Sequence, residues 1–252
     1  MRTLASALCL LALAACAPSV YRADVGAIFV KGQGEIALQN AGGTLALSDN
    51  NRFSGQLGLD DFEASPYLRL EWGHERHRVR AHGFGVNSNG SGRLANDFGG
   101  IVANTPVNTS MDFFSAAASY AYEVFENEWF QLGLGGALGY VKLNVDVRSQ
   151  AGPGRDEVDT DVLVPMPFAD AEFRLGDVSI GANAGVMSAD LGDGNGRYWD
   201  VEGIARWQIT PDVQVLGGYR LLSMDVLGNA SGRDFDADLQ FHGWFFGGGV
   251  TF

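Results

Sequence analysis

Histidine is the residue type best suited to acid–base chemistry at neutral pH, and the chain has four histidines. His74 and His77 flank a predicted short turn. His82 lies in a segment where Arg78 and Arg80 occupy alternate positions, and His242 lies near the end of the sequence. No G-x-S-x-G or H-E-x-x-H motif surrounds any of them, so neither a nucleophile–base pair nor a zinc site is indicated. We therefore expect no catalytic residue, and we expect His82 to belong to a network of charges.

Charged residues of both signs recur at every second position in several segments, opposite apolar neighbours. Such groups are tolerated inside a protein only when they pair or stay hydrated. Glu71, for example, can face Arg78 or Arg80 across a hairpin. The pattern favours a structural ion-pair network, and a polar conduit for small solutes is the alternative. The predicted network consists of Arg69, Glu71, Arg78, Arg80, His82, Asp170, Glu172, Asp200, Glu202, Arg206 and Arg220.

Alternation of apolar with small or polar residues is the main pattern of the chain. It is clear in "VSIGANAGV" (178–186) and in "WDVEGIARWQI" (199–209), where Ile204 is the exception. A period of two is typical of β-strands with one apolar side. After residue 20 no apolar run approaches the ~18 residues that a membrane-spanning helix needs. The sequence thus predicts an all-β fold.

Ten segments of strand length are joined alternately by tight turns and by longer connections rich in Gly, Asn and Asp. This asymmetry indicates a membrane-spanning antiparallel up-and-down β-barrel of ten strands. Eight strands are also possible, and a further strand pair in residues 24–61 would make twelve. A lipid-tethered β-sandwich is the alternative architecture. The predicted strands are 24–38, 62–73, 77–87, 110–124, 129–147, 161–175, 177–189, 198–209, 213–226 and 236–252. The predicted longer connections are 40–61, 88–108, 148–160, 190–197 and 227–235.

Aromatic residues gather at the tight-turn ends of these segments. Aromatic girdles mark the interfaces of membrane proteins, so this placement favours the barrel over the sandwich. The girdle residues are Trp72, Tyr120, Tyr122, Trp129, Phe130, Phe173, Trp207 and Phe252.

The final segment, "FHGWFFGGGVTF", places Trp244, Phe246, Val250 and Phe252 on one side. With the alternation and the turn asymmetry, residues 24–252 resemble small bacterial outer-membrane β-barrel proteins. The resemblance implies an outer-membrane location with both termini in the periplasm, and contact with outer-membrane lipids and lipopolysaccharide. It also implies that the barrel-assembly machinery recognises those four residues. Outer-membrane proteases and lipid A-modifying enzymes use small barrels too, but they need an Asp/His or His/Ser pair near the outer rim.

The N-terminus, "MRTLASALCLLALAAC", has a basic residue followed by a short apolar core, which predicts a signal peptide over residues 1–15. Its L-A-A-C ending resembles the lipobox of bacterial lipoproteins. The resemblance implies that Cys16 is acylated and that residues 16–23 link the lipid to the barrel. Cleavage after an Ala-x-Ala site, with Cys16 unmodified, is the alternative. Cys9 and Cys16 are the only cysteines, so we expect no disulfide and no thiolate metal site.

The net charge of −13 argues against nucleic acid as a partner, because such proteins present a basic face. Acidic residues cluster in two predicted loops, and we expect these loops to be solvated. At an anionic lipopolysaccharide surface they could recruit divalent cations, although no cofactor or resident metal is expected. The loop residues are Asp156, Glu157, Asp159, Asp161, Asp190 and Asp193.

Together these features predict a non-enzymatic integral outer-membrane barrel with a narrow, charge-filled lumen, serving envelope structure or surface interaction. A narrow channel or carrier for small solutes is the alternative. A lipid-modifying enzyme or a protease is the less favoured third hypothesis.

Overall fold

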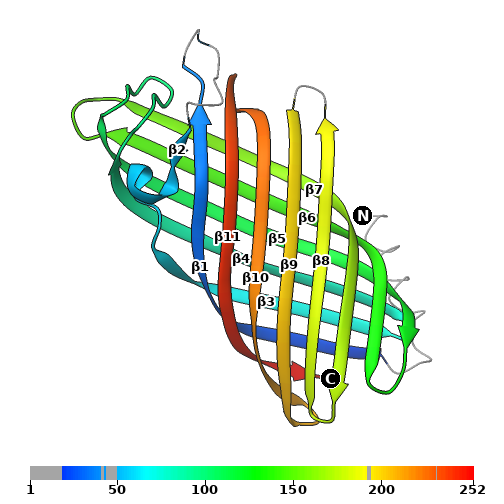
Figure 1. The fold of residues 1–252 in the computed structure, drawn as a ribbon. Helices are drawn as coiled ribbons and strands as arrows, with labels where there is room; N and C mark the ends of the chain where they lie inside the picture. The colour runs from blue at the N-terminus through cyan, green and yellow to red at the C-terminus, as the bar shows by residue number, and fades with distance from the viewer. Residues whose placement is uncertain (1–18, 41–42, 44–49, 192–193, 231) are drawn as a thin grey trace, which may run out of the picture.

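The computed structural model describes residues 19–40, 43, 50–191, 194–230 and 232–252. Within them, all long strands pair antiparallel with their neighbours, and β11 pairs with β1, so that the sheet closes into a ring (Figure 1). The predicted barrel is confirmed, and each of the ten predicted segments corresponds to one long strand. The strands are β1 (Ser19–Leu38), β2 (Asn51–Arg52), β3 (Phe62–His74), β4 (His77–Arg93), β5 (Pro106–Glu126), β6 (Phe130–Ser149), β7 (Arg155–Leu175), β8 (Val178–Leu191), β9 (Gly194–Thr210), β10 (Val213–Ala230) and β11 (Arg233–Thr251).

The connections differ in length between the two ends of the ring. At one end, here called the short-turn end, residues 75–76, 127–129, 176–177 and 211–212 join the strands, and β1 starts and β11 finishes there. At the other, the long-loop end, residues 39–61 contain β2 and the helical turn η1 (Phe53–Leu57), which pack on β1 and β4. No helix of the described residues is long and apolar enough to cross a membrane.

Three of the predicted long connections are mostly strand. Residues 148–160, 190–197 and 227–235 extend hairpins whose connections are only 150–154, 192–193 and 231–232. The prediction of loops is wrong there. Asp- and Asn-rich sequence is typical of loops, but these strand ends carry polar residues on one face. The first strand also begins at Ser19, so it overlaps the predicted linker of residues 16–23, and Arg22 pairs with both β3 and β11.

Exposed aromatic residues form two belts around the ring. The lower belt, at the short-turn end, contains most of the predicted girdle: Tyr120, Tyr122, Trp129, Phe173, Trp207 and Phe252 are exposed. A second belt lies eight positions further along four strands, as the pairs Tyr21 and Phe29, Tyr122 and Phe114, Trp207 and Trp199, and Phe252 and Trp244. Eight residues of strand span about 26 Å. A tilted strand therefore spaces the belts by about the thickness of the apolar band of an outer-membrane barrel.

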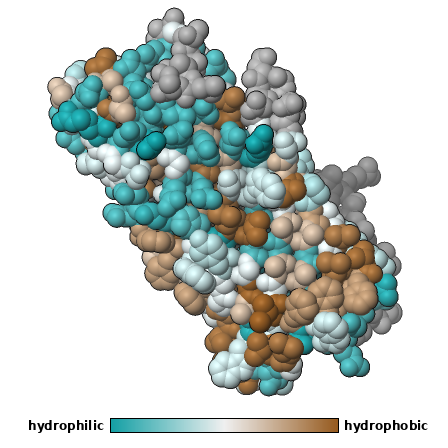
Figure 2. Space-filling view, in the orientation of Figure 1, coloured by the Kyte–Doolittle hydropathy of each residue, from teal (hydrophilic) through white to brown (hydrophobic). Residues whose placement is uncertain are grey.

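The polarity of the two strand faces inverts at the second belt, as β5 shows most clearly. On β5 the outward residues from Phe114 to Tyr122 are apolar, whereas Asn108 and Asp112, nearer the long-loop end, are polar and exposed. The inward residues change from polar to apolar. Ser119 and Glu123 lie at the short-turn end, and the buried Val107, Met111 and Phe113 lie nearer the long-loop end. Figure 2 shows the result as a brown lower half and a teal upper half. The upper half therefore has the apolar interior and polar surface of a soluble protein.

In this upper half the ring flattens into two facing sheets. Pairing between β7 and β8 stops at Phe168 and Gly185, and pairing between β3 and β4 stops at Tyr67 and Phe84. Beyond those points β4–β7 form one sheet, and β8–β11 with β1 form the other, as the diverging upper ends in Figure 1 show. Apolar side chains fill the space between them: the rings of Phe113 on β5 and Phe241 on β11 stack with centroids 3.8 Å apart.

Two prolines account for the end of the β7–β8 pairing. The carbonyl of Met166 faces β6 at Gly136, whereas that of Ala171 faces β8 at Gly181. Odd-numbered residues of β7 therefore direct their backbone groups toward β8, and these include Pro165 and Pro167. Because proline has no N–H, neither can donate to a continued ladder.

The belts predict where a charge on the outer surface is tolerated. Val25 is 66% exposed on β1, midway between Tyr21 and Phe29, so Val25→Arg should destabilise the folded protein in lipid vesicles by about 2–4 kcal/mol. The matched control Gln33→Arg, outward on the same strand but beyond Phe29, should leave stability unchanged. Urea titrations followed by gel migration of unheated samples measure both variants. Equal stability of the two would contradict the assignment of the apolar belt to lipid.

Candidate functional site

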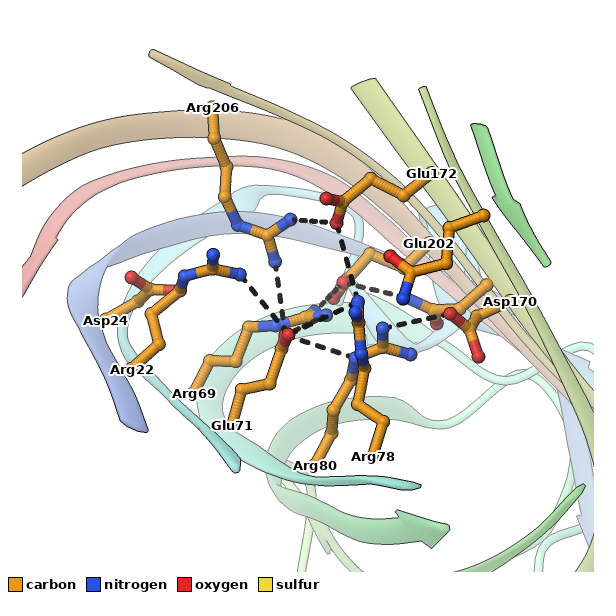
Figure 3. Close-up of polar contacts among 12 residues, drawn as sticks. Arg22, Asp24, Arg69, Glu71, Arg78, Arg80, Asp170, Glu172, Glu202 and Arg206 are labelled. Carbon is orange, nitrogen blue, oxygen red and sulfur yellow. Dashed lines mark hydrogen bonds and ion pairs between the residues drawn. The ribbon is translucent and has the colours of Figure 1, made fainter. Parts of the chain in front are cut away.

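The eleven residues of the predicted charge network lie together inside the short-turn half of the ring. Their side chains are all inward and at most 11% exposed. They come from β3, β4, β7, β9 and β10, and they are brought together because each follows the inward parity of its strand. Figure 3 shows most of these side chains converging at the centre of the barrel.

Glu71 is the carboxylate with the most partners. Its oxygens lie within 4 Å of five guanidinium groups that arrive from β1, β3, β4 and β9 (Figure 3). The nitrogen–oxygen distances are 3.1 Å to Arg80, 3.2 Å to Arg22, 3.5 Å to Arg78, 3.7 Å to Arg206 and 3.8 Å to Arg69. One acid thus links strands on opposite sides of the ring.

A second centre surrounds Glu202 on β9. Arg69 forms an ion pair with Glu202, Tyr67 donates its hydroxyl at 2.8 Å, and Asn183 donates its amide at 3.2 Å. Arg220 lies 3.9 Å from Oε2 of Glu202, the oxygen that accepts from Tyr67. With 1% of Glu202 and 2% of Arg69 exposed, these charges are compensated by one another rather than by solvent.

His82 belongs to this second centre, as expected from its alternation with the arginines. A nitrogen of Arg220 donates to Nε2 of His82, and Asp200 lies 3.7 Å from the same atom. Asp200 also accepts a hydrogen bond from Arg220 at 2.6 Å. Nε2 of His82 therefore lies between a permanent cation and its counter-ion.

Several further residues of the network were missed by the sequence analysis. Arg22 and Asp24 lie on β1, where Gln214 donates to Asp24 at 2.6 Å, and Glu123 on β5 forms an ion pair with Arg78 at 2.6 Å. All of them follow the inward parity of their strands. Extending the alternation of β5 by two residues beyond Ala121 would have identified Glu123.

A layer of aromatic side chains separates the charges from the upper apolar interior. Tyr67 stacks on Phe245 with centroids 4.8 Å apart, and Arg220 lies 5.3 Å above the ring of Phe84. Phe241 and Phe245 are the two aromatic residues that interrupt the small-residue side of the final segment, and they are 1% and 0% exposed. Both rings are therefore packed inside the barrel, directly beyond the charge network.

The remaining histidines lie apart from this network. His74 and His77 flank the β3–β4 turn at the short-turn end, where His77 contacts the hydroxyl of Tyr120 at 2.8 Å. His242 faces outward from β11 and contacts the hydroxyl of Tyr219 at 2.8 Å. Within the described residues no group of three His, Cys, Asp or Glu side chains is placed to hold a metal ion.

The predicted loop and anchor residues have separate positions. Asp156 is structural, because it accepts from Arg233 at 2.6 Å and from the backbone of Gly100 at 2.7 Å. Cys16 and Asp193 lie outside the described residues, as does the side chain of Asp190. Trp244, Phe246, Val250 and Phe252 face outward, and Phe252 and Tyr21 exchange two backbone hydrogen bonds of 2.9 Å that join β11 to β1.

No family model and no curated protein matches the chain. Among solved structures, the outer membrane protease OmpT from Escherichia coli is similar with a TM-score of 0.61 and 11% identity, over 92% of this chain and 96% of that chain. The attachment invasion locus protein Ail of Yersinia pestis matches with a TM-score of 0.35 and 9% identity, over 93% and 99% of the two chains. The Pseudomonas putida toluene transporter TodX matches with a TM-score of 0.36 and 12% identity, over 89% and 68%. The likeness to OmpT shows a shared outer-membrane barrel fold and nothing finer.

The geometry around Glu71 predicts a large loss of stability when its charge is removed. Glu71→Gln leaves five arginines around an uncharged group, and breaking a buried ion pair in this way costs about 3–5 kcal/mol. Glu75→Gln, on the exposed turn of the same hairpin, should stay within about 0.5 kcal/mol of the wild type. Urea unfolding in vesicles measures both. Adding Arg80→Gln to Glu71→Gln should recover part of the loss, and wild-type stability of Glu71→Gln alone would contradict the network.

Proposed function

We propose that this chain is an integral outer-membrane protein without enzymatic activity, whose lumen is closed by its own side chains and which serves envelope structure or surface interaction. The fold shared with OmpT and the two aromatic belts support the location. The observation that carries the closed lumen is burial: Arg220, Glu202 and Arg69 are 1–2% exposed, and Phe245 lies directly beyond them at 0%.

The proposal of a non-enzymatic protein rests on the chemistry of the buried side chains. Arginine stays protonated, so it cannot exchange protons with a substrate. The carboxylates that could act as bases are held by these arginines, and His82 is enclosed by Arg220 and Asp200.

We propose that the short-turn end faces the periplasm and the long-loop end faces outward, as in bacterial barrels generally. Polar outward residues beyond the second belt would then meet lipopolysaccharide. Asp225, Asp238 and Glu35 lie opposite one another on β10, β11 and β1, and divalent cations shared with lipopolysaccharide phosphates would relieve their repulsion. Acylation of Cys16 after removal of residues 1–15 stays a prediction from the sequence.

A conductance measurement tests the closed lumen. The purified protein in planar bilayers should give no discrete current steps, because no water-wide path passes the aromatic layer. Steps that disappear in Arg80→Trp and Arg206→Trp, but persist in the lipid-facing control Leu134→Trp, would contradict the proposal. Such a result would support the narrow channel for small solutes.

The proposed role of Phe252 in assembly makes a separate prediction. Phe252→Ala should reduce insertion into the outer membrane in cells much more than Phe173→Ala, an exposed aromatic of the same belt on β7. Both variants should refold alike into vesicles that lack the assembly machinery, since each loses one lipid-facing ring. Fractionation and gel migration of unheated samples measure both steps. Equal effects in cells would contradict recognition of Phe252.

A further inference from the structure

An apolar groove with a volume of about 660 Å³ lies on the outer surface of the ring. It crosses β4, β5, β6 and β7, and because neighbouring strands lie about 4.8 Å apart, it is about 14 Å long. Half of the ~30 Å hydrocarbon core of a bilayer has a similar length. The groove can therefore hold one acyl chain of a single leaflet.

Small residues form the floor of this groove, and larger ones form its walls. On β6, Gly136 lies between the exposed Leu134 and Leu138, and on β5, Ala118 lies beside Tyr120. These positions lie between the two aromatic belts, so the groove faces the hydrocarbon core. Lipid tails on the rest of the surface are equally apolar, and apolar contact alone does not favour one lipid position strongly. A specific site needs a polar contact in addition.

A polar corner lies at the short-turn end of the groove, where Val79 pairs with Tyr120. His77 shares the outward parity of Val79, and its Nδ1 lies 2.8 Å from the hydroxyl of Tyr120. The ring of His77 also packs edge-on against Tyr122, with centroids 5.4 Å apart, so two contacts hold it. Nε2 carries a proton both in the imidazolium and in the tautomer whose Nδ1 accepts from Tyr120. It can therefore donate to an anion.

Arg76 precedes His77 in the β3–β4 turn and is exposed. Within the described residues its guanidinium forms no ion pair, and its carbonyl accepts from the backbone of Glu123 at 2.8 Å, which places the turn beside β5. Glu75 of the same turn and Glu126 of the next border the cavity inside the ring instead. An unpaired cation and a ring N–H thus lie at the level of the lipid head groups, and a phosphate complements both.

We propose that the groove and this corner together bind one diacyl phospholipid. Its phosphate accepts hydrogen bonds from Arg76 and from Nε2 of His77, and one acyl chain lies in the groove over Ala118 and Gly136. In the orientation proposed above, this lipid belongs to the periplasmic leaflet, but the site itself does not depend on that orientation. The charge of the corner favours a phospholipid over a second copy of the chain as the occupant.

Native mass spectrometry of the refolded full chain in detergent micelles tests the corner, with 1-palmitoyl-2-oleoyl phosphatidylglycerol as the probe. We expect one lipid to bind more tightly than any further lipid. The diacylglycerol with the same chains but no phosphate should bind more weakly. Arg76→Gln should lower the affinity for the probe about fivefold. Arg197→Gln, at an exposed arginine near the long-loop end of β9, is the matched control and should leave it unchanged.

Gly136→Leu tests the groove separately. A Cβ at Gly136 would meet only the carbonyl of Met166, at 3.8 Å, so the larger side chain fits the strand and fills the floor of the groove. The affinity for the probe should fall about tenfold or more, because the acyl chain loses its place. Gly203→Leu is the matched control, since Gly203 is exposed on β9 outside the groove and a Cβ there would meet no atom within 4 Å. Gel migration of unheated samples reports folding of each variant.

Four results would overturn the proposal of a phospholipid site. They are the absence of a preferred first lipid on the folded wild type, equal affinity for the diacylglycerol, unchanged affinity in both Arg76→Gln and Gly136→Leu, and a dimer without lipid in place of the lipid complex. An equal loss of affinity in Gly203→Leu and Gly136→Leu would also overturn it, because the groove would then have no special role. None of these results depends on whether the lumen is closed, so the site and the proposed function can fail separately.

Discussion

The structure depends on the mutual neutralisation of charges inside the ring. Lipid takes the apolar face of each strand, so the polar face must point inward, where its charges have little water. Arginine suits this position because its planar group can meet several carboxylates at once. Glu71 on β3 forms ion pairs with arginines of β1, β4 and β9. One of these arginines, Arg80, also pairs with Asp170 on β7 at 2.9 Å. The ion pairs therefore connect walls that the backbone hydrogen bonds join only around the circumference.

The same strands serve two environments, which explains the change of architecture along them. Near the short turns the ring must close, because unpaired backbone groups are costly in lipid. Beyond the second belt the outer face is polar, as expected for contact with water, and separate sheets packed on an apolar interior become stable. The β7–β8 ladder ends where β7 still lies within the upper part of the apolar belt. Pro165 and Pro167 follow there, and because proline has no N–H, neither leaves an unpaired donor in lipid.

Much of this arrangement could be predicted from period-two alternation, because the same parity holds along each strand. The inward position of Arg69, Glu71, Arg80 and Glu202 followed directly from it. The polarity inversion was not predicted, because "YVKLNVDV" on β6 alternates as well as any membrane segment, and alternation alone does not say which face meets solvent. Contacts across the lumen, such as Arg80 with Asp170, depend on the register of every strand pair between the two residues. A local sequence pattern does not determine these combined registers.

Accessibility of spin labels along β5 would test the central claim most directly. Single labels at successive positions from Asn108 to Val124, in protein reconstituted into vesicles, report oxygen, which concentrates in lipid, and a water-soluble nickel complex. The account predicts that outward labels favour oxygen from Phe114 to Tyr122, with a maximum at Ala118, and favour nickel at Asn108 and Asp112. Inward labels at Ala117 and Ala121 should be reached by neither reagent. Nickel access at inward positions, or oxygen preference extending to Asn108, would contradict a closed lumen and an inversion at the second belt.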